Sequence, residues 1–127
     1  MAYPRKWAIE KATPPAVFVA VDIGRVPGLW VSVFNRDTAQ IEAEATWAAA
    51  GLTNVRYLIR DQEFRLRDGK TIAMYNVITA DFPGAKLRNY SISLEKADRV
   101  ISFAITCLEG LDYEALFKEI FATVTLK

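Results

Sequence analysis

The stretch from Thr71 to Cys107 constrains the fold more than any other part of the sequence. Side chains alternate between the two faces of a strand, and both alternating sets in Thr71–Ala80 are largely apolar. Arg99–Cys107 has bulky residues at one set of positions and small ones at the other, whereas Leu87–Glu95 is apolar on one side only. The stretch therefore predicts three long strands. Thr71–Ala80 needs other elements packed on both of its faces. A helix is the natural candidate to pack on the small-residue face of Arg99–Cys107.

Short polar connections predict that these strands follow one another as a meander. Phe82-Pro83-Gly84 and Lys96-Ala97-Asp98 are typical turn sequences. Upstream, Asp68-Gly69 suits a type I′ hairpin turn that joins Glu63–Leu66 to the first long strand. We therefore expect four consecutive antiparallel strands.

The N-terminal half predicts an extended arm, a pair of strands and a helix. Residues 1–15 are polar and interrupted by proline, and we expect Trp7 and Ile9 to lie against the body. Strands at Ala16–Ile23 and Leu29–Phe34 flank a glycine-rich loop at 24–28. A helix over Thr38–Ala50 is expected to begin at an Asp37 or Thr38 cap and end at Gly51, with a close-packing face. That face consists of Ile41, Ala45, Ala48 and Leu52, and Trp47 lies off it.

The remaining segments complete the order of elements. Val55–Ile59 reads as a further strand, separated from Glu63–Leu66 by Arg60-Asp61-Gln62. Asp112 is expected to cap a final helix that ends near Phe121 and buries Tyr113, Leu116, Phe117, Ile120 and Phe121. This order predicts an α+β fold in which an antiparallel β-sheet is flanked by helices on both faces, an α/β/α sandwich. Residues 1–127 are expected to form a single domain, with 1–15 as the arm and 16–127 as the globular body.

Composition excludes several classes of function. The chain has 127 residues, a net charge of +1 and no histidine. Balanced charge argues against nucleic-acid binding, and no apolar run is long enough for a transmembrane helix. Without histidine there is no Ser-His-Asp or Cys-His arrangement and no imidazole ligand. We expect Cys107, the single cysteine, to be buried and structural. The sequence therefore predicts no catalytic residues, no metal site and no cofactor.

The order of elements resembles the PsbP-like fold group, which includes extrinsic photosystem II proteins, DcrB-like bacterial lipoproteins and Mog-type Ran-binding proteins. The resemblance rests on the Asp37-capped helix after the first hairpin, the Asp68-Gly69 turn, the long meander and the closing segment from Leu111 to Val124. It implies a non-catalytic binding or assembly protein. It also favours an extracytoplasmic location after removal of a leader, with the cytoplasm as the alternative. Metal-binding histidines of some photosynthetic members have no counterpart in this chain.

Two hypotheses about function follow. In the first, the chain binds another protein, and its partner surface comprises Arg56, Arg60, Arg65, Arg67 and Trp47, although a solvated strand face explains the arginines more simply. In the second, it is a small-molecule binder or enzyme with a cavity between sheet and helix. The small residues Ser102, Ala104 and Thr106 would border such a cavity if the helix does not fill it. The identity of the partner and the oligomeric state are left open by the sequence.

Overall fold

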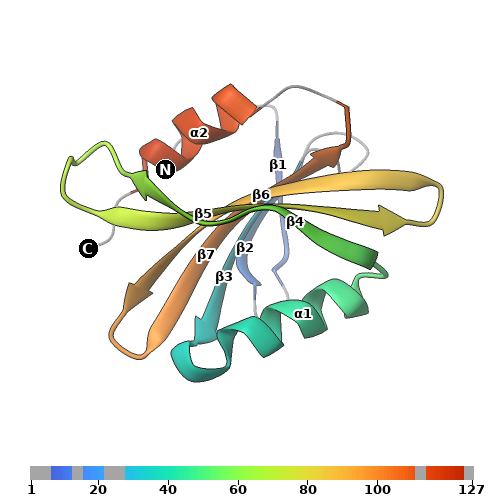
Figure 1. Cartoon of the computed structure of the whole chain (residues 1–127), viewed down its shortest axis with the longest axis horizontal. Coiled ribbons are helices and arrows are strands. Elements are labelled where there is room, and N and C mark those ends of the chain that lie inside the picture. The colour runs from blue at the N-terminus through green and yellow to red at the C-terminus, as the bar shows by residue number, and fades with distance from the viewer. Residues whose placement is uncertain (1–6, 13–15, 22–27, 111–113, 125–127) are drawn as a thin grey trace.

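A computed structural model describes residues 7–12, 16–21, 28–110 and 114–124. They form one antiparallel sheet of seven strands and two α-helices (Figure 1). The strands are β1 (Ala8–Glu10), β2 (Ala16–Val21), β3 (Gly28–Asn35), β4 (Thr53–Arg65), β5 (Ile72–Phe82), β6 (Ala85–Lys96) and β7 (Arg99–Leu108). A 3₁₀ turn at Arg36–Thr38 leads into α1 (Ala39–Ala49), and α2 (Glu114–Ala122) follows the last strand.

The sheet has the order β1-β2-β3-β7-β6-β5-β4. The predicted meander of consecutive antiparallel strands is confirmed, since β4 to β7 are neighbours in turn. The pairing of β3 with β7, from Gly28 opposite Thr106 to Asn35 opposite Arg99, joins the N-terminal strands to this meander. Residues 8–10 of the expected arm are the edge strand β1.

Two local predictions along β4 and its turn are wrong. The residues Arg60-Asp61-Gln62 do not separate two strands, because β4 continues through them with an irregular register and Asp61 takes a φ of 53°. The turn after β4 is not of type I′, because that turn requires a positive φ at both central residues. Gly69 has a positive φ, but Asp68 does not. Asp68 instead stabilises this turn by accepting hydrogen bonds from the backbone N–H groups of Lys70 and Thr71, each at 2.8 Å.

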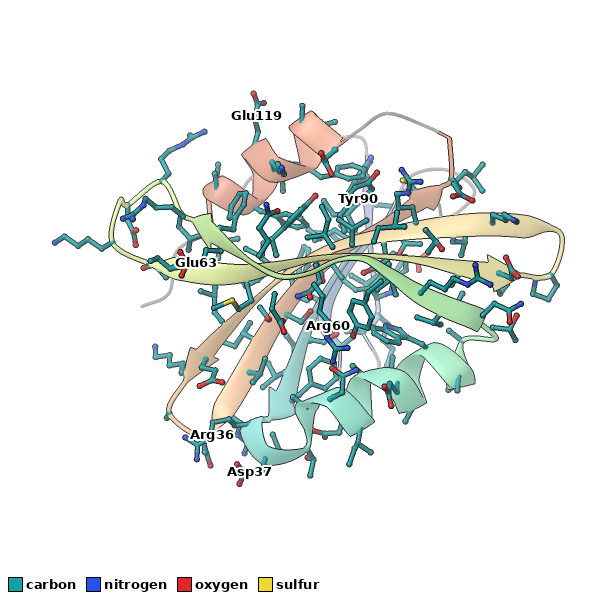
Figure 2. The ribbon with its side chains drawn as sticks, in the orientation of Figure 1. Arg36, Asp37, Arg60, Glu63, Tyr90 and Glu119 are labelled. Atoms are coloured by element: carbon teal, nitrogen blue, oxygen red, sulfur yellow. The ribbon has the colours of Figure 1, made fainter. Side chains whose placement is uncertain are left out.

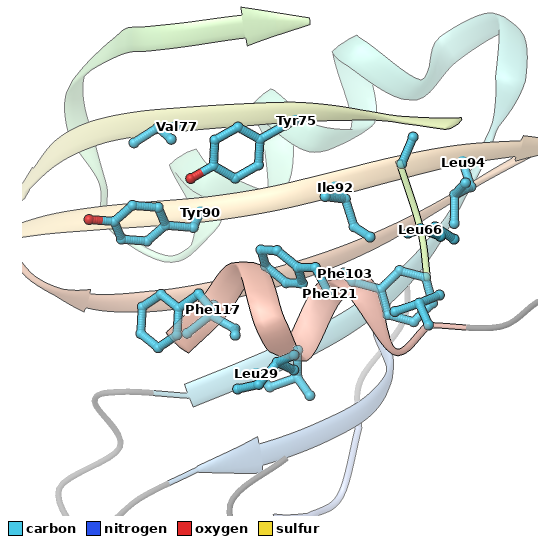
Figure 3. Packing of buried hydrophobic residues seen from close by; sticks show 14 of the residues in the cluster. Leu29, Leu66, Tyr75, Val77, Tyr90, Ile92, Leu94, Phe103, Phe117 and Phe121 are labelled. Atoms are coloured by element: carbon cyan, nitrogen blue, oxygen red, sulfur yellow. The ribbon is translucent and has the colours of Figure 1, made fainter. Parts of the chain in front are cut away.

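One face of the sheet carries the hydrophobic core, and α2 packs on it (Figure 3). The bulky residues of β7 point to this face, together with Tyr75 of β5 and Tyr90 of β6. From α2, the buried side chains are Phe117, Ile120 and Phe121. Leu116 was expected to join them, but it is 43% exposed because it lies on the outer side of the helix.

The opposite face of the sheet lies toward α1, which buries none of its residues (Figure 1). The predicted packing face of this helix is turned outward: Ile41 is 68% exposed, and Ala45 and Ala48 are exposed as well. The predicted α/β/α sandwich is therefore wrong. Strands make up 59% of the described residues and short helices only 22%, and α1 does not form a packed layer.

Several predictions fall wholly or partly outside the described residues. The Asp112 cap, Tyr113 and most of the loop at 24–28 are among them, as are residues 1–6 and 13–15 of the arm. Within the described part of the arm, Trp7 is buried in the core, whereas Ile9 is 65% exposed. No helix in the described segments is long and apolar enough to cross a membrane.

Candidate functional groove

A groove of about 870 Å³ separates α1 from the sheet. Its floor is formed by β3, β7 and β6, and its roof by the C-terminal half of α1. The groove is partly open to solvent, and its described lining is more apolar than polar. The groove lies on the face of the sheet opposite the packed core.

The strands beneath the groove present small side chains, which leaves open space between the sheet and α1. In β7, the small alternating set predicted from the sequence (Ser102, Ala104 and Thr106) lines the groove. The register places Ser91 of β6 and Trp30 of β3 on either side of Ala104. Small side chains leave the backbone of the sheet accessible to a ligand, while Trp30 supplies an apolar wall. The alternation that buries the bulky residues of β7 in the core therefore also produces this floor.

The roof is held above the floor at its first turn and along its inner side. At the first turn, Glu42 accepts hydrogen bonds from the backbone N–H of Asn35 and the Thr38 hydroxyl, both at 3.0 Å. Along the inner side, Trp47 packs edge-on against Tyr57 of β4, with 6.4 Å between the ring centroids. These contacts attach α1 to the sheet without filling the space below the helix.

A smaller cavity of about 140 Å³ adjoins the groove beneath the N-terminal half of α1. Phe34, Ala43, Trp47, Asn89, Ser91 and Ser102 border both spaces. The smaller cavity is also lined by Gln40 from the helix and by Arg60, Asp61 and Asn76 from β4 and β5. It is therefore a polar recess beside the wider and more apolar groove.

Arg60 is the cationic residue of this recess. Its side chain extends from β4 toward α1, whereas Tyr90 points to the opposite side of the sheet (Figure 2). The guanidinium lies over the ring of Tyr57, 4.6 Å from the centroid, and Nε is 4.0 Å from an Asp61 carboxylate oxygen. Because both members of this ion pair are more than half exposed, their attraction is weak.

Of the residues in the predicted partner surface, Arg60 and Trp47 border the recess. Arg56 and Arg65 lie farther along β4, where the register sets them opposite Thr79 and Ile72. Arg67 lies in the turn after the strand, and its backbone N–H donates a 2.9 Å hydrogen bond to the carbonyl of Ala122. The structure therefore brings two of the five residues together, and a role for the other three in partner binding stays a prediction. Sequence reasoning did not place Gln40, Asn76 or Tyr57 at a binding site, because Gln40 reads as part of the helix cap, Tyr57 as a core aromatic residue and Asn76 as an ordinary strand residue.

Burial under α2 raises the pKa values of three groups on the core side of the sheet, Tyr75, Tyr90 and Cys107. Burial raises the pKa of the Tyr75 hydroxyl, and its 3.0 Å hydrogen bond to Glu114 of α2 raises this pKa further. Burial likewise raises the pKa values of Tyr90 and the Cys107 thiol, although Arg88 opposes both shifts. These shifts are explained by packing under α2. No group of three or more potential metal-ligating side chains lies close together in the described segments.

The fold and the groove together define an antiparallel sheet protein with one packed face and one hollow face. No protein-family model matches the sequence, and no curated protein matches it. A similar solved structure is that of PA94 from Pseudomonas aeruginosa, a protein of unknown function. It has a TM-score of 0.58 and 13% sequence identity, and the alignment covers 99% of this chain and 87% of PA94. At this identity the similarity extends to the fold alone.

Proposed function

We propose that this protein is a non-catalytic binding protein that holds an apolar segment of another protein in the groove between α1 and the sheet. The proposal rests on the groove, which is about 870 Å³ of partly open space beneath α1. This helix buries none of its residues. A helix over a sheet ordinarily buries an apolar stripe. In this chain the inner side of α1 is left available for a ligand.

The dimensions and walls of the groove favour a polypeptide segment as the ligand. The 11-residue helix α1 is about 16 Å long at 1.5 Å per residue, so a partner helix of three turns would match it in length. Ala43 and Ala50 above, with Ala104 and Ser102 below, allow close approach of a second backbone. Closely packed helices in membranes use the same kinds of small side chain at their interfaces. An apolar helix in a groove is a common mode of peptide recognition.

Two further observations support a binding role without catalysis. The chain has no histidine, and among the described residues those with a shifted pKa lie on the core side of the sheet or in the β4–β5 turn rather than in the groove. The resemblance to the PsbP-like group also supports a binding role without catalysis, since the members of that group are mostly binding or assembly proteins. We propose membership of that group on the order of the elements alone.

The test uses a matched pair of substitutions in α1. Ala43→Trp places a large side chain in the groove, whereas Ala45→Trp places the same side chain on the exposed outer surface of the same helix. The probe is an acetylated, amidated 14-residue peptide of Leu, Ala and Gln with one apolar face, and calorimetry measures its Kd. We expect the parent protein and Ala45→Trp to bind the probe equally and Ala43→Trp to bind it at least tenfold more weakly. Absence of binding to the parent, or equal binding to all three proteins, would refute the proposal.

A second candidate is an apolar small molecule, and the volume of the groove favours it. Small-molecule sites are typically about 300–1,000 Å³, and the groove lies within that range. The dye anilinonaphthalene sulfonate distinguishes the two candidates when it is added in competition with the probe peptide. If the dye binds the parent but not Ala43→Trp, and the peptide neither binds nor displaces it, the small-molecule function is favoured.

A further inference from the structure

We propose that the polar recess around Arg60 binds a carboxylate carried by the ligand and thereby fixes the direction in which the ligand lies in the groove. The inference rests on the proposed function, because it concerns the end of the same binding site. Six residues line both the recess and the groove, so the recess lies directly beside a ligand held in the groove.

The recess offers hydrogen-bond donors that are not engaged by the described residues. The Arg60 guanidinium makes no hydrogen bond to a described residue; it lies over the Tyr57 ring and forms the long ion pair with Asp61. The Oδ1 atom of Asn76 accepts the backbone N–H of Asp61 at 2.9 Å, which leaves the amide NH₂ group of Asn76 as a donor. The hydroxyl of Tyr57 accepts a 3.2 Å hydrogen bond from Gln40 and keeps its own hydrogen to donate.

Small hydroxyl side chains complete the set of donors. Ser91, Ser93 and Ser102 line the recess from β6 and β7. A carboxylate has two oxygens that accept about four hydrogen bonds, and a guanidinium can donate to both of them. The donors around the recess therefore match a carboxylate better than an ammonium group or an apolar side chain.

Among the described residues that line the recess, Asp61 is the one with a carboxylate, and it is an incomplete partner for Arg60. The 4.0 Å separation of the ion pair is too long for a hydrogen bond, and both side chains are exposed to solvent. A ligand carboxylate positioned closer to the guanidinium can therefore replace Asp61 at little cost. The volume of the recess, about 140 Å³, suits a carboxyl group and its neighbouring carbons rather than a whole ligand.

The test compares three peptides that differ only at one end. The first is the neutral probe described above, with Gln as its last residue. The second has Glu in place of that Gln, and the third keeps Gln but has a free C-terminal carboxylate. Each is titrated into the parent protein, Arg60→Gln and the control Arg56→Gln, whose substituted residue is on the same strand but does not line either space.

We expect at least one acidic peptide to bind the parent about tenfold more tightly than the neutral probe, equivalent to about 1.4 kcal/mol. Arg60→Gln should remove this preference, whereas Arg56→Gln should keep it. Preference for the Glu peptide alone identifies an acidic side chain as the ligand group, and preference for the free terminus alone identifies a chain end. Preference for both means that the recess accepts a carboxylate from either source.

A further variant tests the competition with Asp61. Asp61 has a φ of 53°, a conformation that asparagine also tolerates, so Asp61→Asn should preserve the strand. Removing this charge should increase the preference for the acidic peptide, and a decrease would contradict the inference. The inference is also refuted if the three peptides bind the parent equally, if the preference survives in Arg60→Gln, or if Arg56→Gln loses it as well. In these cases the groove proposal stands, whereas failure of every peptide to bind overturns both proposals.

Discussion

Truncating Phe117 should show how strongly α2 stabilises the sheet. The side chain is 1% exposed, and its ring packs edge-on against Tyr90 with 5.2 Å between the centroids. Phe117→Ala removes this contact and leaves a cavity in the core between α2 and the sheet, at a cost of about 3–5 kcal/mol. The total stability of a domain is about 5–15 kcal/mol, so the variant should still fold in the absence of denaturant.

The matched control is the preceding residue of the same helix. Leu116 is 43% exposed, so Leu116→Ala should cost about 1 kcal/mol or less. Urea unfolding followed by circular dichroism and tryptophan fluorescence measures both variants against the parent. A loss below about 1 kcal/mol for Phe117→Ala, or equal losses for the two variants, would show that α2 does not pack on the sheet as described.

Two other predictions concern single polar groups. Cys107 is fully buried, and burial raises the pKa of its thiol. A small thiol reagent should therefore label Cys107 only after unfolding. Stoichiometric labelling of the folded protein within minutes would contradict this prediction. The hydroxyl of Thr71 and the backbone N–H groups of Thr71 and Lys70 lower the pKa of Asp68 to about 2. Because this folded-state pKa is below the unfolded value, the stabilisation from Asp68 should be complete above about pH 4 and lost as the pH falls toward 2. Urea unfolding of the parent and Asp68→Asn across this range should show their stability difference shrinking with acid, and a constant difference would refute the assignment.

The meander could be predicted because a strand pattern has a period of two and one face of this sheet is fully packed. Phe103, Ile105 and Cys107 all face the core, as their alternation indicated. Pairing between β3 and β7 could not be predicted in the same way. Those strands are separated by some sixty residues, and their sequences carry no turn that would bring them together. Long-range pairing of this kind is decided by the packing of the whole sheet.

The orientation of α1 was predicted wrongly for a physical reason. Hydrophobic periodicity locates the buried face of a helix only when the helix packs against something. The most apolar stripe of α1 contains Ile41, yet the residues that face the sheet are Gln40, Ala43 and Trp47. In the sequence, Trp47 is a large apolar residue that lies off the apolar stripe of the helix. Its position was the sequence feature that indicated a groove on this side of α1. A helix whose inner side is small and partly polar is suited to lie over a ligand site.

The β6–β7 turn contains backbone strain that a single substitution should relieve. Ala97 has a φ of 55°, a conformation that costs an L-residue about 1–2 kcal/mol. Glycine adopts it freely but loses about 0.5–1 kcal/mol more backbone entropy on folding. We therefore expect Ala97→Gly to stabilise the protein by about 0.5–1 kcal/mol, the difference between these two effects.

The β5–β6 turn supplies the reverse substitution as a control. Gly84 has a φ of 82°, and a Cβ atom there would meet nothing within 4 Å, so Gly84→Ala changes the backbone preference alone. It should destabilise the protein by a similar amount, and a double variant with Ala97→Gly should be close to the parent because the turns lie at opposite ends of β6. Urea unfolding of the three variants measures these differences. If both single substitutions shift stability in the same direction, left-handed strain does not govern these turns, and the conformation assigned to Ala97 is wrong.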